Sequence, residues 1–185
     1  GLIIAVLAGT VIIGGLTRIA KASSWLVPIM GGLYVFTATF ILIANFEAVP
    51  SVIKIIFSDA FTGTSVAGGT LMGVIMYGIQ RGAFSNEAGI GTEALIHGTA
   101  KTNSPIKQGF VAMIGPIFDT LLICTATAVV IILSGLWVDD EYSGVSLTAM
   151  AFQTFLGSAG IAVVFLCVVF FGISTIFTFS YYGSV

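Results

Sequence analysis

Apolar residues run through most of this chain, and charged residues interrupt them at only a few places. Four stretches carry no charged side chain: residues 25–46, 62–80, 120–138 and 142–185. A helix rises about 1.5 Å per residue, so roughly 20 apolar residues cross the hydrocarbon core of a bilayer. The pattern therefore predicts an all-α membrane protein, a polytopic bundle of helices that cross the bilayer.

The uncharged stretches and their polar boundaries predict five membrane spans within a single transmembrane domain. We place the spans at about residues 1–16, 25–46, 63–83, 108–138 and 160–182. We expect the third span to continue as a half-helix over residues 86–100. The chain opens and closes inside apolar sequence, so we expect it to be a fragment of a longer protein.

The loops between these spans alternate in charge. One set of loops carries the basic residues Arg18, Lys21, Lys101 and Lys107. The other set carries Glu47 and the acidic triplet at residues 139–141. Because basic loops tend to remain in the cytoplasm, we expect the first set to be cytoplasmic and the protein to be a multi-pass protein of the plasma membrane.

Two segments fit neither a span nor a solvated loop. Residues 49–61, VPSVIKIIFSDAF, place polar side chains at helical spacing opposite apolar ones, which predicts a short helix at the outer interface. Residues 142–157 mix Ser, Thr and Gly with apolar residues, and we expect them to form an outer helical loop packed into the protein.

Composition excludes a soluble domain and gives little further information on partners. Charged residues make up 8% of the chain, against roughly a quarter in soluble globular domains. The formal net charge of −2 indicates no particular partner, and nothing suggests binding to nucleic acid. Cys124 and Cys167 both lie in apolar stretches, so we expect two buried thiols and no disulfide.

The segment RGAFSNEAGIGT, residues 81–92, places polar residues and three glycines where the third span ends. Ser85 and Asn86 are favourable N-cap residues, and Gly89 allows close approach to the backbone. We interpret the segment as one helix broken in two near Phe84–Asn86. The alternative is a cytoplasmic loop that begins an ordinary amphipathic helix.

A broken helix suits a zwitterionic ligand. The first half would end in free carbonyl groups and the second would begin with free N–H groups, so the two ends carry partial charges of opposite sign. An amino acid carries the complementary charges, and discontinuous helices of this kind are common in secondary transporters.

The same residues resemble a known family. The segment closely resembles the alanine or glycine:cation symporter family, the sodium:alanine symporters, over RGAFSNEAGIGTEALIHGTAKTNSPIKQGFVAMIGPIFDTLLICTATAVVIILSG. The resemblance extends to RIAKASSWLVPIM, NFEAVPSVIKIIFSDAF and FFGISTIFTFSYYG. It implies a leucine-transporter-like fold of two inverted five-helix repeats, in which this chain supplies helices four to eight. The missing first, third and tenth helices would supply most of the remaining pocket and sodium contacts.

By this resemblance, the break in the sixth helix lines the pocket for a small neutral amino acid such as alanine or glycine. Phe84 would form an apolar wall, Ser85 and Asn86 would hold the polar ends of the substrate, and Gly89 would allow it to approach the backbone closely.

The resemblance also implies a sodium site in the last span. Its ligands would be the hydroxyl groups of Ser174 and Thr175 and the backbone carbonyl of Phe171. Oxygen ligands suit a hard cation. The alternative is that Ser and Thr bond back to carbonyls of their own helix. We expect no cofactor beyond the coupling sodium ion, and the implied partners are the amino acid, sodium, the lipid bilayer and the remaining helices of the full-length chain.

Three other polar features have open roles. Asp119 lies within a span, where an acid is either functional or paired, as a cation or proton ligand or as a hydrogen-bonded helix anchor. Glu93 and His97 are four residues apart on one helix face, and we favour an ion pair or hydrogen bond over a metal site. Arg81 is either a gate charge or an anchor that reaches toward the membrane surface.

Symport is therefore the leading hypothesis. The alternatives are a structural or assembly subunit of a membrane complex, a cation-coupled carrier of another solute, and an intramembrane enzyme. A single His among 185 residues makes the enzyme the weakest of these.

Overall fold

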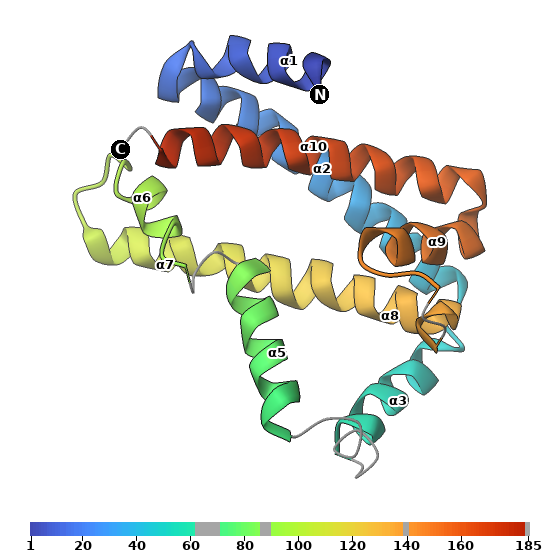
Figure 1. Ribbon diagram of the computed structural model, residues 1–185. Helices are drawn as coiled ribbons and strands as arrows, with labels where there is room; N and C mark the ends of the chain where they lie inside the picture. Colours follow the sequence, from blue (N-terminus) through green and yellow to red (C-terminus); the bar gives the residue numbers. More distant parts are fainter. Residues whose placement is uncertain (62–70, 86–89, 139–140, 184–185) are drawn as a thin grey trace. The chain divides into compact units, whose positions relative to one another are not determined.

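The computed structural model describes residues 1–61, 71–85, 90–138 and 141–183, and all regular structure in these ranges is helical (Figure 1). The predicted all-α class is therefore confirmed. The chain divides into two compact units, Gly1–Ile41 with Ser134–Val185, and Leu42–Leu133.

The first unit begins with two helices joined by a tight turn. α1 spans Leu2–Ile12 and α2 spans Gly15–Ala44, the last three residues of which belong to the second unit. Arg18 and Lys21 therefore lie in a helix and not in the loop that the sequence predicts between residues 16 and 25. Long basic side chains can extend to water from the end of a helix, so they need not mark a loop.

The C-terminal part of this unit is a helical corner. η2, a 3-10 turn, spans Leu136–Val138, and it is followed by α9 over Val145–Leu156 and α10 over Ser158–Tyr182. Gly157 joins α9 to α10 with φ +61° and ψ −143°, a conformation that side chains with a Cβ rarely adopt. α9 occupies most of the range for which the sequence predicts an outer helical loop.

α9 and α10 cross at very close range. A Cβ added at Gly160 would collide with the backbone carbonyl of Phe152 and lie 2.9 Å from the backbone nitrogen of Gln153. The Phe152 side chain is fully buried, and its ring centroid lies 5.4 Å from that of Tyr34 in α2. The absence of a side chain at Gly160 thus lets α9 pack between α2 and α10.

The other end of α10 packs against the start of the chain. Phe177 is buried with Ala8 of α1 and Ile19 of α2, and Ile173 and Tyr181 of α10 pack at the edge of this cluster. The cluster fixes the face of α10 that also carries Ser174, which is buried.

The second unit contains α3 at Val49–Phe61, α5 at Leu71–Ser85, α6 at Glu93–His97 and a long helix in three parts. These parts are α7 (Pro105–Ile117), the π-helical segment η1 (Phe118–Cys124) and α8 (Thr125–Ser134). α3 covers the residues for which the sequence predicts a short interfacial helix.

Two observed helix boundaries differ from the approximate ones expected from the sequence. The fourth span, expected to reach residue 138, ends at Ser134, and residues 136–138 form the separate turn η2. The half-helix expected over residues 86–100 is helical only at Glu93–His97 among its described residues. Gly91 has φ +83°, which is incompatible with a right-handed helix and places a turn before α6.

Three helices in the described part of the chain are long and apolar enough to cross a membrane: Thr17–Ala44, Pro105–Ser134 and Ser158–Tyr182. α1 has 11 residues and the described part of α5 has 15, which is short for a bilayer core of about 30 Å. The arrangement of five spans therefore stays a prediction.

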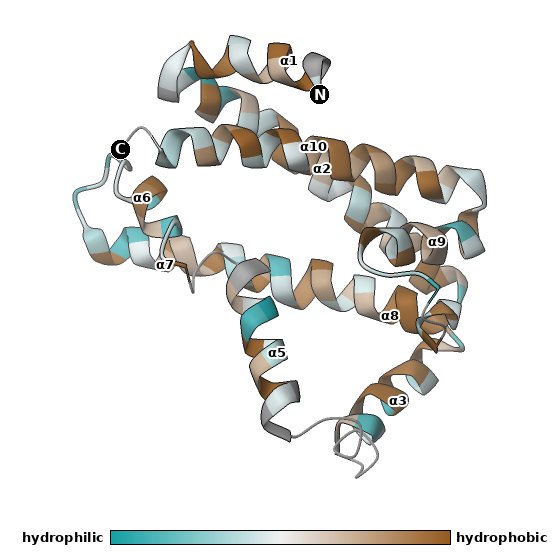
Figure 2. Cartoon of the chain, viewed as in Figure 1, coloured by the Kyte–Doolittle hydropathy of each residue, from teal (hydrophilic) through white to brown (hydrophobic). Residues whose placement is uncertain are grey.

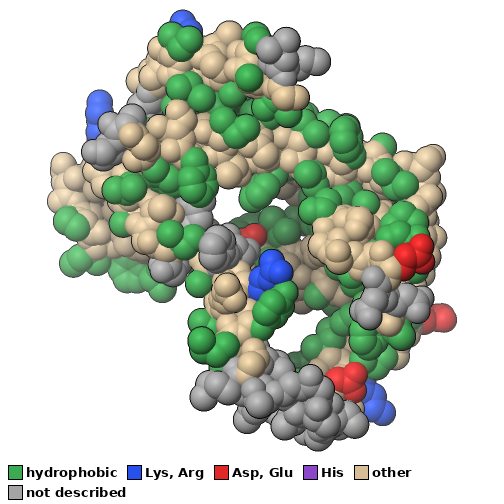
Figure 3. All heavy atoms as spheres, in the orientation of Figure 1, with side chains coloured by type: hydrophobic (Ala, Val, Ile, Leu, Met, Phe, Trp, Pro, Cys, Tyr) green, Lys and Arg blue, Asp and Glu red, His purple; other side chains and the backbone are tan. Residues whose placement is uncertain are grey.

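Apolar side chains cover the outside of these helices. α10 is brown along most of its length in the hydropathy view (Figure 2), and hydrophobic side chains are spread over the visible face while charged ones occupy few places (Figure 3). Large exposed side chains such as Phe36, Phe118 and Phe165 are 61–74% accessible. Such surfaces suit lipid or neighbouring helices.

We predict that Gly160→Ala destabilises the full-length protein. The added methyl group must push the Phe152 backbone away, and overpacking of this kind costs about 1–3 kcal/mol. A thermal melt of the purified protein in detergent should show a lower midpoint. Gly172→Ala is the control, because a Cβ there meets nothing within 4 Å on the same helix. Equal midpoints for the two variants would contradict the tight crossing.

Candidate substrate and cation sites

The break predicted near Phe84–Asn86 falls at the C-terminal end of α5, and part of it lies outside the described residues. Phe84 and Ser85 have helical backbones at the C-terminal end of α5, so the chain leaves the helix no earlier than residue 86. Asn86 and Gly89 lie outside the described residues. The chain is described again at the turn of residues 90–92, and α6 follows. Of the four predicted substrate residues, the structure thus places two, at the end of α5.

The end of α5 that leads into this interruption lies against η1, as the green and yellow ribbons in Figure 1 show. Arg81, one turn before Ser85, is held on its own helix: its Nη2 donates to the hydroxyl of Tyr77 at 2.7 Å. The guanidinium carbon also lies 5.0 Å from the centre of the Tyr77 ring. This cation–π contact keeps the charge beside the exposed face of α5.

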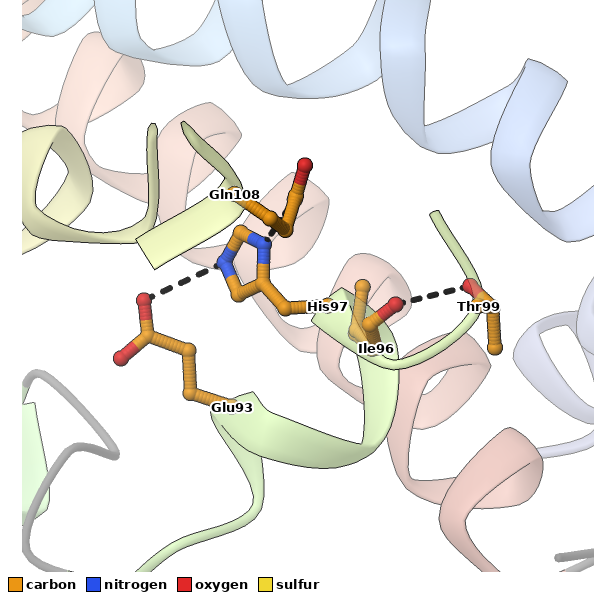
Figure 4. Close-up of polar contacts among 5 residues, drawn as sticks. All are labelled: Glu93, Ile96, His97, Thr99 and Gln108. Atoms are coloured by element: carbon orange, nitrogen blue, oxygen red, sulfur yellow. Dashed lines mark hydrogen bonds and ion pairs between the residues drawn. The ribbon is translucent and has the colours of Figure 1, made fainter. Parts of the chain in front are cut away.

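On the far side of the interruption, three polar side chains join α6 to α7 (Figure 4). The Nε2 atom of His97 lies 3.4 Å from Oε1 of Glu93, and its Nδ1 atom lies 2.6 Å from Nε2 of Gln108. With the Gln108 amide nitrogen as the donor, Nδ1 is the acceptor, and Nε2 is then the ring nitrogen that carries a proton toward Glu93. The predicted pairing of Glu93 with His97 is confirmed.

This arrangement does not resemble a metal site. No group of three or more His, Cys, Asp or Glu side chains suited to a metal ion occurs among the described residues. Both ring nitrogens of His97 are already used by Glu93 and Gln108. The sequence identified Glu93 and His97 but missed Gln108. The only signal for Gln108 was a polar residue in the first turn of an apolar helix, and such a residue is usually solvated.

The predicted sodium ligands lie together on α10. The buried hydroxyl of Ser174 donates to the carbonyl of Phe171 at 2.8 Å, and Thr178 donates to the carbonyl of Ser174 at 3.1 Å. Thr175 is half-buried beside them. The bond from Ser174 to Phe171 is the bond to a carbonyl of the same helix that the sequence analysis gave as the alternative to a sodium site. It joins two of the three predicted ligand oxygens. To bind a cation, Ser174 must turn its proton away from Phe171 so that both oxygens face the ion.

Asp119 lies in the π-helical segment η1. A π-helix pairs residues five apart, and such segments are common at functional positions. Thr125 donates its hydroxyl to the carbonyl of Thr120 at 3.1 Å, and Cys124 Sγ lies 3.9 Å from Oδ2 of Asp119, both at a spacing of five. The wider turn therefore brings Asp119 and Cys124 to one side of the helix. Cys124 is exposed, contrary to the expectation of a buried thiol, whereas Cys167 is buried as expected.

Comparison with known proteins identifies the family. The sequence profile described as "Sodium:alanine symporter family" matches residues 1–185. The chain is 41% identical to the transporter YflA of Bacillus subtilis, over 99% of this chain and 40% of that protein. It is 37% identical to the probable sodium/glutamine symporter GlnT of the same organism, over 99% of this chain and 38% of GlnT.

The sodium/alanine symporter AgcS of Methanococcus maripaludis is 36% identical, over 99% of this chain and 41% of AgcS. The chain spans about two-fifths of the length of these curated relatives. With a family profile that covers every residue and relatives at this level of identity, the chain belongs to the sodium:alanine symporter family.

Proposed function

We propose that the full-length protein is a secondary transporter of the plasma membrane that couples the entry of an amino acid to a cation gradient. More specifically, we propose symport of a small neutral amino acid, alanine or glycine, with sodium. It is a transporter and not an enzyme. Membership of the sodium:alanine symporter family supports this proposal, and the observation that carries it is the non-helical turn at residues 90–92, where Gly91 has φ +83°, between α5 and α6.

The proposed substrate site uses the residues of this interruption. The C-terminal end of α5 carries partial negative charge and attracts an ammonium group. Phe84 would line the small side chain of the substrate, Ser85 and Asn86 would hold its polar ends, and Gly89 would let it approach the backbone. One N–H of the nearby Arg81 guanidinium donates to Tyr77, and the group lies over that ring; the proposal assigns the substrate carboxylate to Asn86 and backbone N–H groups.

The proposed sodium site uses Ser174, Thr175 and the carbonyl of Phe171. Ser174 and the Phe171 carbonyl already lie within 2.8 Å, so both can contact one ion after a rotation of the hydroxyl. The surrounding packing supports such a site, because Phe177 and Ile173 hold this face of α10 against the first two helices. No cofactor other than the coupling ion is proposed.

The first test is uptake by the full-length protein in proteoliposomes. We expect labelled alanine or glycine to accumulate under an inward sodium gradient and not under an equal potassium gradient. Because the relatives are named for different amino acids, unlabelled glutamine should be included as a competitor. A proton gradient without sodium serves as the second comparison. Uptake that is indifferent to sodium would rule out sodium symport.

We predict that Asn86→Ala weakens substrate binding without preventing folding. Loss of a hydrogen bond to a charged group costs about 1.5–3 kcal/mol, which corresponds to at least a tenfold rise in the dissociation constant. Calorimetric titration of the full-length protein with alanine in sodium buffer measures the change. Asn103→Ala, in the exposed connection before α7, is the matched control. Wild-type affinity in Asn86→Ala would remove this residue from the site.

We predict that Ser174→Ala raises the sodium concentration needed for half-maximal uptake by about tenfold or more, because a ligand oxygen to the ion is lost. Thr178→Ala is the control, since Thr178 lies one turn later and donates only to the carbonyl of Ser174. Sodium titrations of uptake at saturating amino acid compare the two. If both variants respond to sodium alike, Ser174 has no role beyond the back-bond to Phe171.

A further inference from the structure

α6 cannot hold its position alone. It has five residues, and isolated helices of fewer than about 12 residues are marginal in water. On one side it follows the turn of residues 90–92, and on the other it leads into the non-helical residues 100–104. Its position must therefore be set by contacts with another element, and the helix on which it packs is α7.

α6 contacts α7 at two positions along the α7 axis. His97 Nδ1 meets the Gln108 amide at 2.6 Å in the first turn of α7. A Cβ at Gly115, about two turns further along the same helix, would lie 3.9 Å from Oε1 of Glu93. Glu93 in turn orients the His97 ring through Nε2. The three side chains and the bare backbone at Gly115 therefore fix both the height and the rotation of α6 against α7.

α7 is a suitable anchor. Ser104 caps its N-terminus by accepting from the backbone nitrogen of Lys107 at 3.5 Å, and Pro105 occupies the first turn, where its missing N–H is not needed. The helix then continues without interruption of helical structure through η1 and α8 to Ser134. A group fastened to Gln108 is thus fastened to a candidate membrane span.

We propose that His97 is a positioning residue, and that Glu93, His97 and Gln108 form a latch that fastens the segment after the interrupted helix to α7. The substrate part of this inference rests on the proposed function. α5 holds the segment before the interruption, through its contact with η1. The latch holds α6 and the turn of residues 90–92 that precedes it.

The latch affects substrate affinity through the population of the competent state. A ligand that binds one arrangement of the segment has an apparent dissociation constant equal to its intrinsic value divided by the fraction of molecules in that arrangement. Breaking the His97–Gln108 bond lowers that fraction. Because the latch touches no reacting or transported group, its loss should raise the Michaelis constant and leave the maximal rate nearly unchanged.

The experiment uses the full-length protein without its native cysteines, spin-labelled at Leu95→Cys in α6 and Val111→Cys in α7. Both positions are exposed, at 40% and 54%. Double electron–electron resonance gives the distribution of distances between them. His97→Ala and Gln108→Ala are the test variants. Thr99→Ala is the matched control, because it removes the neighbouring bond from Thr99 to the carbonyl of Ile96 and no bond to α7 (Figure 4).

We expect one narrow distance in the parent and in Thr99→Ala, and a broad or second distance in His97→Ala and Gln108→Ala. Sodium-driven alanine uptake should show a Michaelis constant about three- to tenfold higher in the test variants, as expected for the loss of one partly buried hydrogen bond. His97→Gln keeps an acceptor for the Gln108 amide and should restore much of both values, which a purely structural role of the imidazole would not do.

Unchanged distances in both test variants would overturn the latch, whatever the transport result. Altered distances with an unchanged Michaelis constant would overturn its role in positioning the substrate site. If the parent protein fails to transport alanine or glycine, the proposed function fails, while the distance measurement still decides whether His97 fixes α6 to α7.

Discussion

A backbone N–H or C=O group without a hydrogen-bond partner in hydrocarbon costs several kcal/mol, and the rest of this structure depends on that constraint. Most of the chain meets it by remaining helical, as in the three candidate membrane-crossing helices. Where the chain leaves the helix between Ser85 and Glu93, the neighbouring described residues are among the most polar in the molecule. Arg81, Glu93 and His97 lie within one or two turns of the interruption. Each of them already contacts another side chain.

The two units show different solutions to close packing. In the first, α9 and α10 touch through the bare backbone at Gly160, and α10 is held at its other end by Phe177. In the second, polar side chains make the specific contacts between α6 and α7. The predicted sodium ligands thus lie on a helix fixed by apolar packing. The predicted substrate residues adjoin a segment fixed by hydrogen bonds, which are directional and can be exchanged for bonds to water.

Much of this architecture could be read from the sequence because it depends on local composition. The charge-free stretches predict helices near those observed, and the helix at Val49–Phe61 follows from its amphipathic spacing. The loop predicted around Arg18 is part of helix α2. A basic residue can mark a membrane boundary within a helix as well as a loop. The half-helix was predicted to begin too early, because the left-handed conformation of Gly91 depends on the surrounding fold. Gln108 could not be assigned, since nothing in the sequence states that α6 folds back onto α7.

The π-helical segment changes how the long helix from Pro105 to Ser134 presents its side chains. An α-helix turns about 100° per residue, and each wider turn in Phe118–Cys124 shifts the angular position of everything after it. A single helical wheel drawn through the whole helix therefore assigns α8 residues to the wrong faces. Two wheels are needed, one ending at Ile117 and the other starting at Thr125. A row of side chains that faces the protein interior along α7 can continue as a row that faces lipid along α8. One continuous helix can therefore pack against different neighbours in its two halves.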